Sequence, residues 1–161
     1  MKTKLILFLL MAWQLSFSQQ KSTTYYFIRH AEKVDNSKDP NLSESGMQRS
    51  QKWKAIFESI DFDQIYSTNY KRTQQTATPI ATADKIEVQL YDPQKIDLKA
   101  FKKITLGRKV LVVGHSNTTP EFVNKIINQQ VFNPIEDTTF GNLYIVTIIG
   151  DTISYQLLKL P

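Results

Sequence analysis

One segment, residues 109–113 (KVLVV), constrains the fold of this chain more than any other. A continuous apolar run of this length is typical of a strand that is buried on both faces, as in a parallel sheet. Gly114 directly after the run marks the end of the strand. Because parallel strands need crossover connections, which are usually helices, this segment favours a sheet layered with helices.

Patterns typical of strands and helices alternate along the rest of the chain. Runs rich in aromatic and β-branched residues predict strands at 23–29, 63–67, 86–90, 142–149 and 152–158. Apolar spacing and helix-start signals predict helices behind Ser43, at 70–83, at 94–104 and from about 119 onward. The alternation predicts an α/β layered fold with a mainly parallel sheet, and 161 residues suit a single domain.

The first helix is expected to begin at Ser43, whose side chain suits an N-cap. A polar stretch with the composition of a loop, residues 32–41, separates this helix from the first strand. The apolar residues expected on the buried face of the helix are Met47, Trp53, Ile56, Phe57 and Ile60.

Residues 1–18 have the pattern of a secretory signal peptide. Two lysines precede an apolar stretch at 5–13, and the small residues Ser16 and Ser18 suit the positions before a cleavage site. We therefore expect cleavage after Ser18, a mature domain of residues 19–161, and a periplasmic or secreted protein. The apolar stretch is short for a bilayer span, so no stable membrane association is expected after cleavage; an uncleaved anchor is the alternative.

Composition excludes several kinds of site. The chain has no cysteine, which excludes disulfide scaffolds, thiolate zinc sites, iron–sulfur clusters and cysteine nucleophiles. Its two histidines are too few for a multi-histidine metal site, so no metal or cofactor is expected. Loss of the signal peptide lowers the 20 basic residues to 18 against 15 acidic ones, and the charge from +5 to +3. This charge is too small to indicate a nucleic-acid partner.

Chemically versatile side chains follow three of the expected strands. Arg29 and His30 follow the first strand, Ser67 follows the second, and His115 follows the run at 109–113. Ligands of α/β sheets bind at the carboxyl ends of strands, so these residues are expected to share one site. A single histidine is more often structural, but both histidines of the protein occupy such positions, which favours a functional role.

Arginine and histidine at one site point to a phosphoryl group. Only 4 arginines occur against 16 lysines, and Arg29 and Arg72 both lie in segments that follow expected strands. A guanidinium matches phosphate oxygens in bidentate fashion, and a neutral imidazole can attack phosphorus to form a covalent intermediate. Such donors would stabilise the charge on a transferring phosphoryl group without a metal.

Four segments occur in an order that resembles a known family. They are Arg29-His30-Ala31-Glu32, residues 42–46 (LSESG), residues 67–77 (STNYKRTQQTA), and Gly114-His115-Ser116-Asn117. Together they resemble the motifs of the histidine phosphatase superfamily, the phosphoglycerate mutase-like proteins, over nearly all of the chain after residue 18. Ala31 departs from the family pattern, which usually has glycine there. The resemblance implies a three-layer α/β/α sandwich with a mainly parallel central sheet.

The resemblance also implies roles for individual residues. His30 would be the nucleophile that becomes phosphohistidine, and water would then hydrolyse this intermediate. Arg29, Arg72 and His115 would hold the phosphoryl oxygens, with Asn36 as a weaker phosphate ligand. Three further candidates for substrate binding are Ser67, Ser116 and Asn117, and each has a structural alternative. Ser67 would only end a strand, Ser116 and Asn117 would orient His115, or Asn117 would cap the following helix.

The motifs leave the proton donor for the leaving group open. The mutase-like branch takes it from a glutamate between the second arginine and the second histidine, where this chain has Asp84, Glu87, Asp92 and Asp97. Asp92, which follows an expected strand, is the first choice, although an aspartate before proline also suits a turn. Glu121 is the second choice, and its alternative role is to stabilise the start of a helix.

The sequence therefore predicts a phosphoric monoester hydrolase that acts on a phosphorylated small molecule as a monomer or homodimer. Mutase activity is less expected, because the chain has little sequence for a lid over a bound intermediate. Dephosphorylation of a phosphohistidine protein is less expected for an exported chain. The alternative from another class is a non-catalytic module that binds a phosphorylated ligand.

Overall fold

The computed structural model describes residues 20–161, so the expected signal peptide lies outside the described residues. Strands and helices alternate through most of this range, as the sequence predicts. In chain order the elements are β1 (Ser22–Arg29), α2 (Glu44–Ile56), β2 (Gln64–Thr68), α3 (Lys71–Asp84), β3 (Val88–Tyr91), α4 (Leu98–Ile104), β4 (Lys109–Gly114), α5 (Thr118–Ile127), β5 (Asn142–Ile149) and β6 (Thr152–Lys159).

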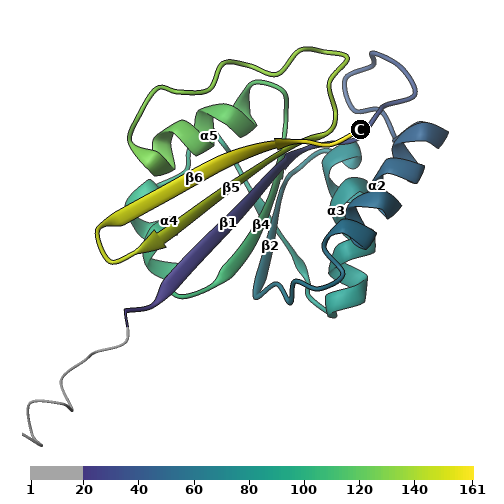
Figure 1. The fold of residues 1–161 in the computed structure, drawn as a ribbon. Helices are drawn as coiled ribbons and strands as arrows, with labels where there is room; N and C mark the ends of the chain where they lie inside the picture. Colours follow the sequence, from purple (N-terminus) through teal and green to yellow (C-terminus); the bar gives the residue numbers. More distant parts are fainter. Residues whose placement is uncertain (1–19) are drawn as a thin grey trace, which may run out of the picture.

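The strands form one 6-stranded sheet in the order β3-β2-β4-β1-β5-β6 (Figure 1). Strands β3, β2, β4 and β1 run parallel, and the β5–β6 hairpin continues the sheet in antiparallel fashion. The prediction of a mainly parallel sheet is confirmed. The run at 109–113 lies in β4, which pairs with both β1 and β2 at the centre of the sheet.

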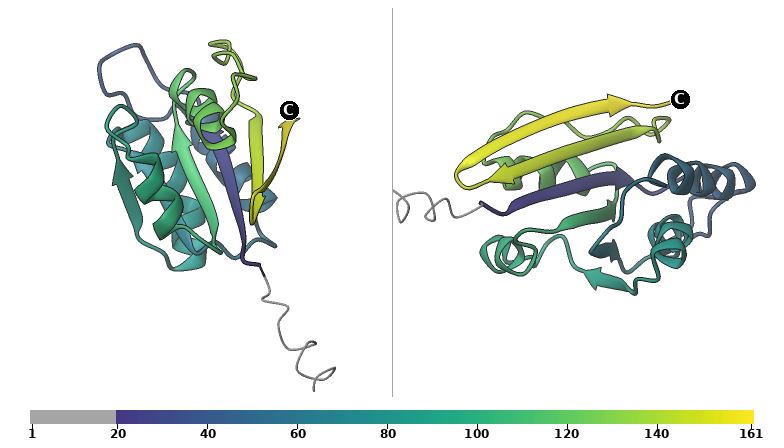
Figure 2. Two further views of the ribbon diagram at one scale, coloured as in Figure 1. Left: turned by 90° about the vertical axis from the view of Figure 1, so that its left-hand side faces the viewer. Right: turned by 60° about the horizontal axis from the view of Figure 1, so that its bottom comes forward.

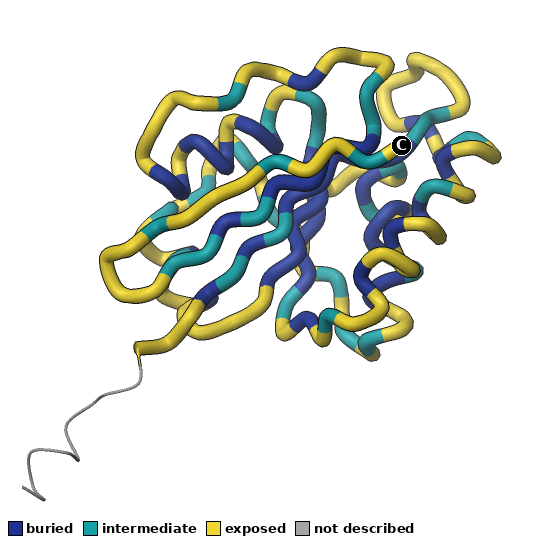
Figure 3. The backbone as a smooth tube through the Cα atoms, viewed as in Figure 1, coloured by how far each residue is buried: buried dark blue, intermediate teal, exposed yellow. Residues whose placement is uncertain are grey.

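Helices cover both faces of the sheet, as the right-hand view of Figure 2 shows. Alternate residues of β4 point to opposite faces: Val110 and Val112 pack with α4 and α5, whereas Leu111 and Val113 pack with α2 and α3. Both faces of β4 are therefore buried, which explains its continuous apolar sequence (Figure 3). The three-layer α/β/α prediction is confirmed.

The start of α2 is fixed as expected, but its buried face is narrower. The Ser43 side chain accepts a hydrogen bond from the backbone N of Gly46 at 3.1 Å, the geometry of an N-cap. Trp53 is buried, whereas Met47 and Ile56 are 55% and 46% exposed, so the prediction that these two belong to the core was wrong. The helix packs mainly against α3, which covers only part of its surface.

The helix expected at 94–104 begins later, at Leu98, because Asp97 caps it. The Asp97 carboxylate accepts hydrogen bonds from the backbone N atoms of Lys99 and Ala100 at 2.9 and 3.0 Å. No helix within residues 20–161 has the length and apolar character needed to cross a membrane.

Candidate active site

The two histidines meet because the strands that precede them are parallel neighbours. In the register of β1 with β4, Arg29 lies beside Gly114, and the backbone N of His30 donates to the Gly114 carbonyl at 2.9 Å. The next residue of each strand is a histidine, and the two imidazole centroids lie 5.5 Å apart. The sheet thus brings together two side chains that are 85 positions apart in the sequence.

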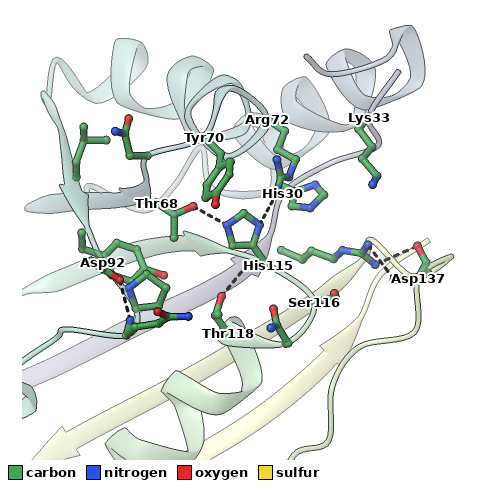
Figure 4. A pocket seen from close by; sticks show the side chains of 17 residues that line it. His30, Lys33, Thr68, Tyr70, Arg72, Asp92, His115, Ser116, Thr118 and Asp137 are labelled. Atoms are coloured by element: carbon green, nitrogen blue, oxygen red, sulfur yellow. Dashed lines mark hydrogen bonds and ion pairs between the residues drawn. The ribbon is translucent and has the colours of Figure 1, made fainter. Parts of the chain in front are cut away.

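A cavity of about 890 Å³ opens at this end of the sheet (Figure 4). Seven of the ten candidate residues from the sequence line it, which supports the expectation of one shared site. They are Arg29, His30, Arg72, Asp92, His115, Ser116 and Asn117.

His30 is held as a neutral imidazole whose Nε2 carries the lone pair. Its Nδ1 lies 2.7 Å from the carbonyl oxygen of Ala31, and because a carbonyl can only accept, Nδ1 must carry the proton. The pKa of His30 is lowered to about 3, chiefly by burial and also by the charges of Arg29, His115 and Arg72, whereas the hydrogen bond to Ala31 acts to raise it. A neutral ring with a free Nε2 lone pair is the form that can attack an electrophile.

His115 is held by side chains from β2 and α3. Its Nε2 lies 2.9 Å from the Thr68 hydroxyl, and its Nδ1 lies 3.3 Å from Nη2 of Arg72. Burial and the neighbouring charges of Arg72 and Arg29 lower the pKa of His115 to about 4. Both histidines are therefore neutral near pH 7.

Each of the two arginines of the site has a buried N–H group that makes no hydrogen bond to the described residues. Nη1 of Arg29 donates to the carbonyls of Glu136, Asp137 and Thr139 at 2.9, 3.1 and 3.0 Å, which ties the segment before β5 to the site. Arg29 Nε and Arg72 Nη1 are both buried without a hydrogen-bond partner among the described residues. Buried N–H groups without a hydrogen bond are costly, and although Oδ1 of Asp39 lies 4.0 Å from Arg72 Nη1, a bound anion would supply the missing acceptors.

The loop after His30 is fixed to the start of α2. The Glu32 carboxylate accepts from Nε of Arg49 at 2.8 and 3.0 Å, and the Glu32 carbonyl accepts from the backbone N of Ser43 at 2.9 Å. A Cβ at Gly46 would overlap that carbonyl oxygen, so the LSESG segment needs glycine at this position. Glu32 therefore holds the loop in place rather than lining the cavity.

The two candidate proton donors differ in position. Asp92 lines the cavity, is half-exposed, accepts from the backbone N of Gln94 at 2.9 Å and lies 3.7 Å from Nζ of Lys95. Asp92 thus forms the turn that its sequence context predicts and still faces the site. Glu121 lies in the first turn of α5, outside the cavity lining, and pairs with Lys125 at 2.7 Å.

The structure does not bring Asn36 or Ser67 to the cavity lining. Asn36 is exposed in the loop between β1 and α2, which projects away from the sheet (Figure 1). Ser67 is fully buried, and its hydroxyl donates to the Thr68 carbonyl at 2.9 Å. Because neighbouring residues of a strand alternate in direction, the hydroxyl of Thr68, not that of Ser67, reaches the site.

Ten lining residues were not among the candidates from the sequence, and they include Lys33, Thr68, Tyr70 and Asp137. Thr68 and Tyr70 lie between Ser67 and Arg72, so strand alternation and proximity to the motif were the available signals. The Tyr70 ring lies 4.5 Å from the guanidinium of Arg72 and packs edge-on against the His115 ring, with centroids 5.0 Å apart.

The sequence of residues 25–93 matches the model of the histidine phosphatase superfamily (branch 1). This range includes the first histidine, the LSESG segment and the second arginine. Over these residues the chain is similar to the histidine phosphatase superfamily, the family that its sequence motifs resemble. No curated protein matches the sequence.

Solved structures extend this similarity beyond the matched range. An α-ribazole-5′-phosphate phosphatase candidate from Escherichia coli has a TM-score of 0.67 at 14% identity, covering 86% of this chain and 96% of that one. A phosphoserine phosphatase from Entamoeba histolytica has a TM-score of 0.63 at 14% identity, covering 83% and 95%. A phosphoglycerate mutase from Bacillus anthracis has a TM-score of 0.64 at 14% identity, covering 88% and 94%. At this identity the comparison shows that the chain shares their fold, which occurs in phosphatases and in a mutase alike.

Proposed function

We propose that this protein is a metal-independent phosphatase that hydrolyses a phosphomonoester through a phosphohistidine on His30. One observation carries the proposal: a neutral His30 with its lone pair on Nε2 shares a cavity with two arginines, each of which has a buried N–H group without a hydrogen bond among the described residues. A neutral imidazole that can act as a nucleophile, beside N–H groups that can bind an anion, is suited to phosphoryl transfer. The superfamily supports a phosphatase, although its fold also occurs in a mutase.

The proposed reaction has two steps. Nε2 of His30 forms a bond to phosphorus while the bond from phosphorus to the leaving oxygen breaks, and that oxygen receives a proton. Water then attacks the phosphohistidine, inorganic phosphate leaves, and His30 returns to its neutral form. Arg29, Arg72 and His115 bind the three phosphoryl oxygens, whose charge they stabilise in both steps.

We assign the proton donor to Asp92. It lines the same cavity as His30, and in the view of Figure 4 it lies on the far side of His115 from His30. The same carboxylate would take a proton from water in the second step. Glu121 is the weaker candidate, because it pairs with Lys125 outside the cavity lining.

Hydrolysis of p-nitrophenyl phosphate in the presence of EDTA tests the nucleophile. The mature protein should hydrolyse it, and His30→Asn, which replaces the ring with a neutral amide, should not. A labelled substrate quenched within one turnover should leave acid-labile phosphate on the parent protein alone. Activity retained in His30→Asn would overturn the mechanism. Phosphate binding without turnover in the parent would instead make the protein a phospho-ligand-binding module.

Leaving groups of different basicity test the assignment of Asp92. Asp92→Asn should lower kcat/KM for an alkyl phosphate by about 100-fold or more, because a poor leaving group needs a proton, and should change p-nitrophenyl phosphate hydrolysis far less. Glu121→Gln is the matched control and should leave both rates unchanged. Equal losses for both substrates in Asp92→Asn would contradict the assignment.

Export and partners complete the proposal. Residues 1–18 support a periplasmic or secreted protein, and a mature N-terminus at Gln19 in the exported protein would test this. We propose a phosphorylated small molecule as substrate and a monomer or homodimer as the working form. A cytosolic protein that retains residues 1–18 would refute the export proposal.

A further inference from the structure

A chain of hydroxyl groups leads from the first turn of α3 to the second histidine. Thr73 and Thr68 are buried, with exposed fractions of 0% and 1%. Their hydroxyl oxygens lie 3.0 Å apart, and the Thr68 oxygen lies 2.9 Å from Nε2 of His115. Each hydroxyl has a single proton to donate, so the direction of one bond fixes the direction of the next.

The direction is set at the far end of the chain. The Thr73 hydroxyl lies 2.9 Å from the Thr68 carbonyl and 2.8 Å from the Tyr70 carbonyl, both of which can only accept. The Thr73 proton is therefore committed, and Thr73 accepts from Thr68. Since the Thr68 proton is then also committed, Thr68 can only accept from Nε2 of His115.

The opposite nitrogen of the ring gives the same answer independently. Nδ1 of His115 lies 3.3 Å from Nη2 of Arg72, which is always a donor, so Nδ1 must present a lone pair. His30 has the reverse arrangement, with its proton on Nδ1. The two histidines thus carry their protons on opposite nitrogens.

We propose that Thr68, oriented by Thr73, is a positioning residue that fixes the His115 tautomer and turns the Nδ1 lone pair toward the phosphoryl site. This inference rests on the phosphatase function proposed above. When a phosphoryl oxygen accepts the hydrogen bond from Arg72, Nδ1 of His115 takes up a proton from the monoanionic substrate or from solvent. The new Nδ1–H group then donates a hydrogen bond to that oxygen. The resulting imidazolium has both N–H groups bonded, Nδ1 to phosphate and Nε2 to Thr68, and the only hydrogen bond of the ring that is lost is the one from Arg72 to Nδ1.

Nitrogen NMR of the resting protein tests the tautomer without any turnover. The chain has two histidines, so the ¹⁵N spectrum of the imidazoles contains two rings, and His30→Asn assigns them by removing one. We expect protonated Nε2 for His115 and protonated Nδ1 for His30. A His115 ring protonated mainly on Nδ1 would overturn the proposal, and this measurement needs no variant at Thr68.

Variants of the two threonines test the function of the hydroxyl chain. Thr68→Val should lower kcat/KM for an alkyl phosphate by about 10- to 100-fold, the effect of one hydrogen bond to a charged group, and Thr68→Ser should restore most of it. Thr73→Val frees the Thr68 proton and should reduce the Nε2-protonated fraction of His115. Thr78→Val is the matched control, because Thr78 lies on the same helix, where its exposed hydroxyl donates to the Gln74 carbonyl at 2.8 Å.

The results separate this inference from the proposed function. Wild-type kcat/KM in Thr68→Val, or a Thr68→Ser loss as large as that of Thr68→Val, would refute the role of the hydroxyl. An unchanged tautomer ratio in Thr73→Val would refute the role of Thr73. Failure of the phosphatase proposal would appear as absent hydrolysis in the parent protein, whatever the tautomer of His115.

Discussion

Acidification should destabilise this protein because two neutral histidines are held in its site. The folded pKa values are about 3 for His30 and about 4 for His115, against 6.5 for a solvated histidine. A lowered folded pKa means that the unfolded chain binds protons more readily. Stability from these groups is therefore fully present above pH 6.5 and is lost as the pH falls through 6.5 toward the folded values.

The size of the loss follows from proton linkage. At about pH 5 an unfolded histidine is almost fully protonated while each folded ring is not, which costs about 2 kcal/mol per histidine. Together His30 and His115 should lower the free energy of unfolding by about 4 kcal/mol between about pH 7.5 and pH 5. This is a large part of the total stability of an ordinary domain.

Urea unfolding of the mature protein in phosphate-free buffer measures this loss. Phosphate must be absent because a ligand of the folded state would mask the effect. In each single variant, His30→Asn or His115→Asn, the free energy of unfolding should fall by about 2 kcal/mol less than in the parent over the same pH range. In the double variant almost none of the loss of about 4 kcal/mol should remain. A parent protein equally stable at both pH values, or a double variant with the full loss, would refute the reasoning.

Three further substitutions test the packing and the ion pairs. Gly46→Ala should lower the unfolding free energy by about 1–3 kcal/mol, although alanine favours helices, because its Cβ would overlap the Glu32 carbonyl; stabilisation would contradict this. Trp53→Ala should cost about 3–5 kcal/mol in urea unfolding, because Trp53 is 1% exposed; a loss under about 1 kcal/mol would show a misplaced core. Glu121→Gln should change stability by no more than about 0.5 kcal/mol, because its pair with Lys125 is on the surface.

The sheet could be predicted from sequence because its central strands have few alternatives. Residues 110–113 are buried and all apolar because both faces of this strand are covered, and the aromatic strand at 23–29 pairs beside it. Element ends were predicted less well because they depend on single hydrogen bonds. Asp97 caps α4 and moves its start to Leu98, an effect that apolar spacing does not reveal.

Candidate site residues that directly follow strands could be predicted from the sequence. Residues whose place in the cavity depends on the direction of the side chain were missed. His30 and His115 follow adjacent parallel strands, so the rule of strand ends places them together. Ser67 and Thr68 are consecutive hydroxyl residues, and which of them faces the cavity depends on the pleat of β2. Asp137 reaches the site because Arg29 binds carbonyls of its segment, a long-range contact without a local sequence signal.

The electrostatics that destabilise the free protein in acid also prepare it for an anion. Arg29 and Arg72 lower the pKa of both histidines, and the same positive field attracts a phosphate dianion. A bound dianion would offset that field and raise the pKa of His115, so phosphate binding should be accompanied by proton uptake. Because linkage is reciprocal, phosphate should then protect the protein from acid more than it protects it near neutrality. The anion should raise the pKa of His30 less, because the Nδ1 proton of His30 already has an acceptor in the Ala31 carbonyl.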